Sequence, residues 1–162
     1  MMVEIKTVEV EIPDGCNVIL GQAHFIKTVE DLYETIAESG MSVKFGLAFC
    51  EASMKRLIRS DGNDEALIRH AEKEAMKIGA GHSFIIFLRE GFPINIVNRV
   101  QAVSEVTTLY AATANPLKAL IAEDGEQRGI IGVLDGGRPL GIESEQEKAE
   151  RREFLRKIGY KR

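Results

Sequence analysis

The chain has 162 residues, a formal net charge of −4, 44% hydrophobic residues and 28% charged residues. This length suits a single domain, residues 1–162, that can bury a core, and the composition excludes global disorder. Lys and Arg are interspersed with Asp and Glu instead of forming a basic stripe, so we expect no nucleic-acid partner, while a locally basic pocket for a small phosphate-bearing ligand remains compatible with the charge.

The first part of the chain predicts two strands, a helix and a buried strand. Residues 3–12 alternate apolar and polar side chains, which is typical of a half-exposed strand. The Pro-Asp-Gly turn at residues 13–15 leads into a second predicted strand at residues 16–25, so a hairpin is expected. Thr28 is the predicted N-cap of a helix. The continuous apolar run at residues 43–50 predicts a central strand covered on both faces.

The second part of the chain continues to mix helices and strands. Asn63 is the predicted N-cap of a helix that reaches Ile78, and residues 82–88 predict another buried strand. Pro93 suits the first turn of a short helix. The other expected elements are strands at residues 57–59, 106–112, 117–122 and 129–134, and a helix from a capping box at Ser144 to Ile158. Without strict βαβ alternation, we predict an α/β fold, a three-layer α/β/α sandwich in which helices cover both faces of a mixed sheet.

The two cysteines and the N-terminus indicate the compartment. Cys16 and Cys50 lie in apolar stretches, which predicts buried thiols in a reducing environment. Two cysteines and three histidines without short spacing predict no metal site, and the sequence does not identify a cofactor. Residues 1–6 lack a signal-peptide core, and no run is long enough to span a membrane. We therefore expect a cytoplasmic protein without a membrane partner.

Polar residues follow several apolar strands, where ligands bind in open α/β sheets. One cluster follows the strand that ends at Cys50, a second surrounds the turn after Ala112, and a third follows Leu134. The members of the three clusters are Glu51, Ser53, Lys55 and Arg56; Thr113, Asn115 and Lys118; and Asp135 with Gly136 and Gly137. Together they are candidates for one ligand pocket, because loops carry sites disproportionately. Each cluster taken singly is also explained by an ordinary surface turn.

The histidines and two asparagines are further candidates. His82 follows Gly79-Ala80-Gly81, which is either a turn that brings His82 into a pocket or a glycine C-cap before a strand. His24 on a strand is a catalytic candidate or a hydrogen-bonded packing residue, and His70 within a charged helix predicts a solvated side chain. Asn95 and Asn98, three residues apart, share one helix face that either reads the edge of a base or sugar or is simply polar. No Walker loop and no G-x-G-x-x-G motif is present.

Five segments resemble the adenosine-specific kinase family of archaeal and bacterial proteins. They are Gly21–Leu32, Val43–Ser53, Ala80–His82, Phe92–Asn95 and Ala111–Lys118, and the resemblance covers nearly the whole chain. The resemblance implies a three-layer α/β/α fold, a homotrimer, and binding of adenosine and AMP in preference to the di- or triphosphate. It also implies a histidine that can carry a phosphoryl group.

The chemistry implied by this resemblance can be assigned to residues of this chain. A neutral imidazole can attack phosphorus and form a phosphoramidate, whose oxygens need cations or backbone N–H donors. We expect His82 as the catalytic histidine, with His24 second, Lys55, Arg56 and Lys118 as cations, and Glu51 or Asp135 orienting the imidazole. The ligand-binding candidates are Glu51, Ser53, Lys55, Asn95, Asn98, Thr113, Asn115, Lys118 and Asp135. The alternatives are a non-enzymatic nucleoside-binding or sensor module and a purely structural trimer.

Overall fold

The computed structural model describes residues 2–40 and 42–162. In chain order the elements are β1 (Glu4–Val10), β2 (Asn17–Ala23), α1 (Thr28–Ala37), β3 (Lys44–Cys50), β4 (Ile58–Gly62), α2 (Glu65–Ile78), β5 (Ser83–Arg89), α3 (Pro93–Ala102), β6 (Val106–Thr113), β7 (Leu117–Asp124), β8 (Gln127–Asp135) and α4 (Glu145–Lys157). Most predicted elements are present with boundaries shifted by a few residues. The expected α/β class is confirmed.

The strands form two sheets, where the sequence suggested one mixed sheet. A five-stranded sheet has the order β4-β3-β5-β2-β6, and a three-stranded sheet has the order β1-β7-β8. Every pairing among the described strands is antiparallel. Strands β2 and β3, which α1 connects, do run in the same direction, but β5 lies between them and is antiparallel to both. This insertion removes the parallel contact that a β–α–β connection would otherwise produce.

The expected hairpin between the first two strands is wrong. Strand β1 pairs with β7 in the three-stranded sheet, because β5 and β6 occupy both edges of β2 and leave no edge for β1. The crossing segment between the sheets is held by α2 at Glu11. The backbone N–H of Glu11 donates to Glu74 Oε2 at 3.1 Å, its carbonyl accepts from His70 Nε2 at 2.6 Å, and its carboxylate binds Lys73 Nζ at 2.9 Å.

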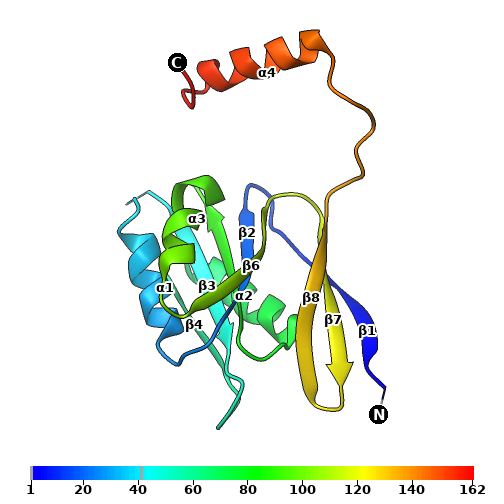
Figure 1. Cartoon of the computed structure of the whole chain (residues 1–162). Helices are drawn as coiled ribbons and strands as arrows, with labels where there is room; N and C mark the ends of the chain where they lie inside the picture. The colour runs from blue at the N-terminus through cyan, green and yellow to red at the C-terminus, as the bar shows by residue number, and fades with distance from the viewer. Residues whose placement is uncertain (1, 41) are drawn as a thin grey trace.

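Two apolar cores lie on the two faces of the five-stranded sheet. One face packs against α1 and α3, and the other packs against α2 and the inner face of the three-stranded sheet. Figure 1 shows this arrangement, with α1 and α3 on one side and β1, β7 and β8 on the other. One outer layer is therefore a helix beside a small sheet. Strands β3 and β5 are buried along almost their whole length, as their apolar runs predicted.

Helix α2 is capped by a different residue from the one predicted. Asp64 is the N-cap and accepts a hydrogen bond from the Leu67 N–H at 3.1 Å. The Asn63 side chain instead pairs with β3, accepting from the Phe45 N–H and donating to the Val43 carbonyl, each at 2.8 Å. At the other end, Gly79 is a left-handed C-cap with φ 57°, which confirms the capping interpretation of that glycine.

Helix α2 approaches the sheet so closely that Gly46 of β3 has no room for a side chain. A Cβ at Gly46 would overlap the peptide between Leu67 and Ile68 of α2. We therefore expect Gly46→Ala to lower the free energy of unfolding by about 3 kcal/mol, because backbone must move to relieve the overlap. Thermal and urea unfolding followed by circular dichroism measure this change.

The matched control is Gly40→Ala, whose Cβ would make an ordinary contact with Val43 Cγ2 at 3.8 Å. It should change the unfolding free energy by no more than about 0.5 kcal/mol. Equal stability of the two variants would contradict the close approach of α2 to β3.

Candidate functional site

His24 and His82 line one cleft of about 280 Å³ at an end of the five-stranded sheet. The cleft is lined by His24, Phe25, Ile26, Phe49, Glu51, Ala52, Ser53, Met54 and His82. Because β2 and β3 run in the same direction, their carboxyl ends meet here, and β5 begins between them. The site thus lies where open sheets of this class bind ligands.

The backbone at His82 connects the three strand ends that form the cleft. Its N–H donates to the Cys50 carbonyl at 2.8 Å, and its carbonyl accepts from the Ala23 N–H at 2.9 Å. His82 is half-buried and has φ 67°, a left-handed conformation that is uncommon outside glycine, although histidine adopts it more often than most residues. Its ring stacks on Phe49 with centroids 6.0 Å apart and planes inclined by 13°. The direction of the imidazole is therefore set by the backbone and by Phe49.

His24 is more exposed and is held by the segment before β6. Its backbone N–H donates to the Glu105 carbonyl at 3.0 Å, and Nε2 lies 3.3 Å from the Ser104 carbonyl. A carbonyl oxygen can only accept, so Nε2 carries the hydrogen in this contact and Nδ1 keeps the lone pair. In the neutral imidazole this contact therefore leaves the Nδ1 lone pair unused.

An ion-pair group supports the chain next to His24. The buried carboxylate of Glu105 binds Lys27 Nζ at 2.8 Å, and Lys27 also pairs with Asp31. These carboxylates raise the pKa of Lys27, Asp31 first and Glu105 second, and Lys27 in turn lowers the pKa of Asp31. Because Glu105 holds His24 through its carbonyl and Lys27 through its carboxylate, it fixes both ends of the His24–Lys27 segment.

The loop of residues 52–56 is closed at its base by Glu51 and Leu57. The Glu51 N–H donates to the Leu57 carbonyl at 3.1 Å, and the Leu57 N–H donates to Glu51 Oε2 at 3.0 Å. Arg59 Nε donates to Glu51 Oε1 at 2.8 Å. The Leu57 N–H, and next the Arg59 guanidinium, lower the pKa of Glu51. Glu51 is thus engaged in shaping the loop, and its expected role of orienting an imidazole does not agree with these contacts.

Backbone strain gathers around the same loop. Among the described residues, four non-glycine residues have left-handed φ values, and three of them are Met54 (59°), Arg56 (50°) and His82 (67°). Such conformations cost energy and tend to cluster at functional sites. They support the assignment of this region as the candidate site.

A second cleft of about 660 Å³ lies on the other side of the loop and shares Glu51 and Ala52 with the first. Lys55, Arg56 and Arg128 line it. Arg56 pairs with Glu126 at 3.3 Å. Within the part of the chain that the structure describes, Lys55 has no carboxylate within 4.0 Å. The expected cations Lys55 and Arg56 therefore line this second cleft, which adjoins the histidine cleft.

The second and third polar clusters of the sequence lie elsewhere. Thr113 Oγ1 donates to Asp135 Oδ1 at 2.8 Å, and Asn115 Nδ2 lies 3.3 Å from the same oxygen. Thr113 pairs with Val18 at the start of β2, whereas His24 follows the end of β2. These clusters therefore join each other at the opposite end of the sheet, and Asp135 does not reach either cleft histidine.

The remaining candidates are also outside the cleft. Lys118 is exposed on the three-stranded sheet opposite Glu9. Asn95 Oδ1 accepts from the Phe92 N–H at 2.9 Å and so caps α3, and Asn98 is exposed on the same helix. Helix α3 begins beyond the far end of β5, away from His82.

His70 is half-buried against Phe87 with ring centroids 4.6 Å apart, so its predicted solvated position is wrong.

Sequence reasoning missed the apolar lining of the cleft. Phe25 and Ile26 are exposed although they are large and apolar, and Met54 is almost fully exposed. The sequence does contain a signal for this lining. Phe25 and Ile26 directly follow His24 at the end of a predicted strand, where a turn is expected to carry polar residues. Phe49 was identified only as a core residue, yet it also carries the His82 ring.

Within residues 2–40 and 42–162, no group of three His, Cys, Asp or Glu residues is arranged to hold a metal ion. Among the helices described, none has both the length and the apolar character needed to cross a bilayer.

Comparison with known proteins identifies a family and similar solved structures. A family model described as "Adenosine specific kinase" matches residues 8–161. The crystal structure of the PH1918 protein from Pyrococcus horikoshii OT3 is similar to the chain, with 42% sequence identity, a TM-score of 0.95 and 99% coverage of both chains. No curated protein matches the chain.

Replacement of Glu51 by Gln should loosen the loop in a pH-dependent way. Because the pKa of Glu51 is lowered from its ordinary value of 4.5 in the folded protein, its carboxylate stabilises the fold above that value. The stabilisation is lost as the pH falls through the folded-state pKa. We expect Glu51→Gln to melt at a lower temperature than the wild type at pH 7, and the gap to close below about pH 4.

Thermal melts at a series of pH values between 7 and 3 test this expectation. Glu34→Gln is the control, because Glu34 is exposed and its side chain makes no hydrogen bond or ion pair among the described residues. A gap that stays constant down to pH 3 would show that the carboxylate charge is not responsible.

Proposed function

The chain belongs to the adenosine-specific kinase family, and we propose that it binds adenosine or AMP in the cleft between His24 and His82. The observation that carries this proposal is the pairing of two histidines with exposed apolar side chains in one cleft at the strand ends. A purine base needs an apolar surface, and its ribose and phosphate need polar partners.

The residues that line the cleft include both kinds of partner. Phe25, Ile26 and Met54 supply an apolar surface on which a base can stack, a contact worth about 1–3 kcal/mol. Ser53 and the histidines supply hydrogen-bonding groups for the ribose or a phosphate. The volume of about 280 Å³ is close to the lower limit of small-molecule sites, roughly 300 Å³, which suits a nucleoside or monophosphate better than a triphosphate.

We further propose that the site can carry a phosphoryl group on a histidine. His24 Nδ1 would attack the phosphorus of a phosphoryl donor, forming an N–P bond while the P–O bond to the leaving group breaks. The 5′-hydroxyl of adenosine would then attack the same phosphorus, the N–P electron pair would return to Nδ1, and the hydroxyl proton would leave to solvent. His24 suits this role because Nε2 contacts Ser104 and leaves Nδ1 free. His82, favoured from the sequence, would contact the ligand.

A non-enzymatic nucleoside-binding or sensor module is the second candidate. It is favoured by the position of Lys55 and Arg56, which line the neighbouring cleft instead of the histidine cleft. A phosphoryl group in transfer needs nearby cations or N–H donors, whereas binding alone does not.

We also propose a homotrimer in the cytoplasm. The trimer comes from the family resemblance, and the compartment is supported by Cys16 and Cys50, which are free, buried thiols. Neither nucleic acid nor membrane is proposed as a partner, in line with the net charge of −4.

Isothermal titration calorimetry tests the ligand. We expect heat of binding from adenosine and AMP, weaker binding of ADP and ATP because the cleft is small, and weaker binding of guanosine because the matching family is adenosine-specific. Binding of guanosine or ATP without binding of adenosine or AMP would overturn the proposed ligand.

Single His→Asn variants at positions 24, 70 and 82 test the histidine roles. We expect His82→Asn to weaken adenosine binding by about 1–3 kcal/mol, the cost of a lost ligand hydrogen bond. We expect His24→Asn to abolish acid-labile phosphate, measured by intact mass after incubation with labelled ATP. His70→Asn should change neither signal, because His70 lies on α2 outside the cleft.

If neither the wild type nor any variant takes up phosphate while adenosine still binds, the binding-module candidate replaces the phosphotransferase. If His82→Asn alone loses the phosphate, His82 is the acceptor and the assignment to His24 is wrong.

A further inference from the structure

Residues 136–162 form a C-terminal arm that leaves the body of the protein. No residue after Asp135 belongs to either core, and no residue of α4 is buried. Figure 1 shows α4 standing apart at the end of an extended segment that continues from β8. The arm makes up about one-sixth of the chain. It therefore gains nothing from packing within its own chain.

The root of the arm is fixed by the polar cluster that lies outside the ligand cleft. Thr113 and Asn115 hold the Asp135 carboxylate, and the Gly136 N–H donates to the Pro116 carbonyl at 3.0 Å. Gly136 has φ 66°, and a Cβ there would come within 3.1 Å of Asn115 Nδ2. The chain therefore leaves β8 through a defined turn, which directs the arm away from its own sheet.

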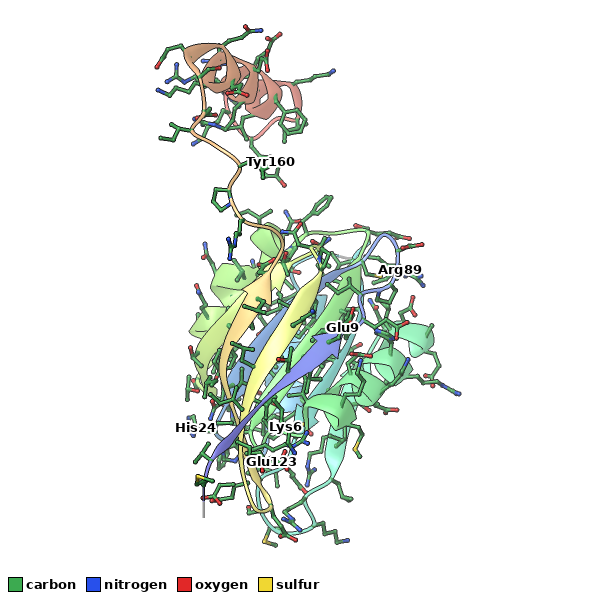
Figure 2. The ribbon with its side chains drawn as sticks, turned by 90° about the vertical axis from the view of Figure 1, so that its right-hand side faces the viewer. Lys6, Glu9, His24, Arg89, Glu123 and Tyr160 are labelled. Atoms are coloured by element: carbon green, nitrogen blue, oxygen red, sulfur yellow. The ribbon has the colours of Figure 1, made fainter. Side chains whose placement is uncertain are left out.

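The arm presents apolar side chains to the outside. Leu140 and Ile142 are 104% and 98% exposed and flank a bend at Gly141, so the segment before α4 leaves two aliphatic side chains uncovered. On α4, Phe154 and Ile158 are one helical turn apart and are also exposed. Figure 2 shows Tyr160 on the arm, apart from the labelled side chains of the body. An isolated helix of 13 residues is only marginally stable in water, so α4 needs a surface to pack on.

The outer face of the three-stranded sheet carries uncovered aliphatic side chains. Ile5, Ile131 and Leu134 are each more than half exposed there, and Gly129 and Gly132 leave open space between them. Figure 2 shows this sheet at the front of the body with no helix lying over it. The solvent face of an antiparallel sheet is normally polar, so these aliphatic side chains, on the same face as Glu9 and Lys118, indicate a contact surface.

We propose that the arm of one copy packs on the outer face of the β1-β7-β8 sheet of a second copy. The Pyrococcus horikoshii structure matches 99% of both chains with a TM-score of 0.95. The TM-score would be lower if the arm, which is about one-sixth of the chain, did not superpose. The arm therefore leaves the body in a similar direction in that protein. The contact joins different surfaces of the two copies, so its repetition gives a ring where the rotation between copies closes and an open filament where it does not.

Sedimentation velocity on full-length variants tests this contact. The arm variant carries Leu140→Asp and Ile142→Asp, the face variant carries Ile131→Asp, and the control carries Ile94→Asp at an equally exposed site on α3. We expect the wild type and the control to sediment as the same oligomer, and the arm and face variants each to sediment as one chain. An equimolar mixture of the arm and face variants should give a species of two chains, because one intact arm then meets one intact face.

A wild type that is a single chain, or an arm or face variant that keeps the wild-type mass, overturns the proposal. Circular dichroism melts confirm that each variant is folded, and Leu134→Ser replaces Ile131→Asp if the latter unfolds. Adenosine binding is measured separately, so a failure of the proposed ligand leaves this test unaffected. A dimer that dissociates on arm mutation would support the arm contact and contradict only the trimer.

Discussion

Strand β5 is paired on both edges and buried on both faces, and the position of the candidate site follows from this. Because it lies between β2 and β3 and runs opposite to both, its first residue stands beside their last residues. His82 directly precedes β5, and His24 directly follows β2. Two histidines that are 58 positions apart in the sequence are thereby brought to one cleft. The hydrogen bonds of the His82 backbone to Ala23 and Cys50 complete this arrangement.

The sequence predicted those features well that depend only on the residue types within a short segment. The apolar runs of β3 and β5 indicated two-sided burial, and Ser144 with Glu147 indicated a capping box, which the structure contains. Pairing partners were not predictable, since alternation in residues 3–12 reports which face is buried and not which strand lies alongside. The partner of β1 is therefore β7, more than 100 residues away.

The candidate site shows the same division. His24, Glu51, Ser53 and His82 were all identified from the sequence, and the structure brings them to one cleft. Thr113, Asn115 and Asp135 were equally plausible, because they also follow strands, but the direction of each strand decides at which end of the sheet its last residue lies. The left-handed backbone at Met54, Arg56 and His82 had no sequence signal, because glycine is the residue that usually marks such positions.

The three contacts of α2 with Glu11 bear on how the molecule can move. The segment that carries the chain from the small sheet to the large one is clamped by Glu74, His70 and Lys73, so it cannot serve as a hinge. Rotation of one sheet against the other would break all three contacts together with the shared core. The 52–56 loop is held at its base and by one exposed ion pair, Arg56 with Glu126, and its side chains are exposed. We therefore expect adaptation to a ligand to be a local rearrangement of a few residues, with the two sheets behaving as a rigid frame.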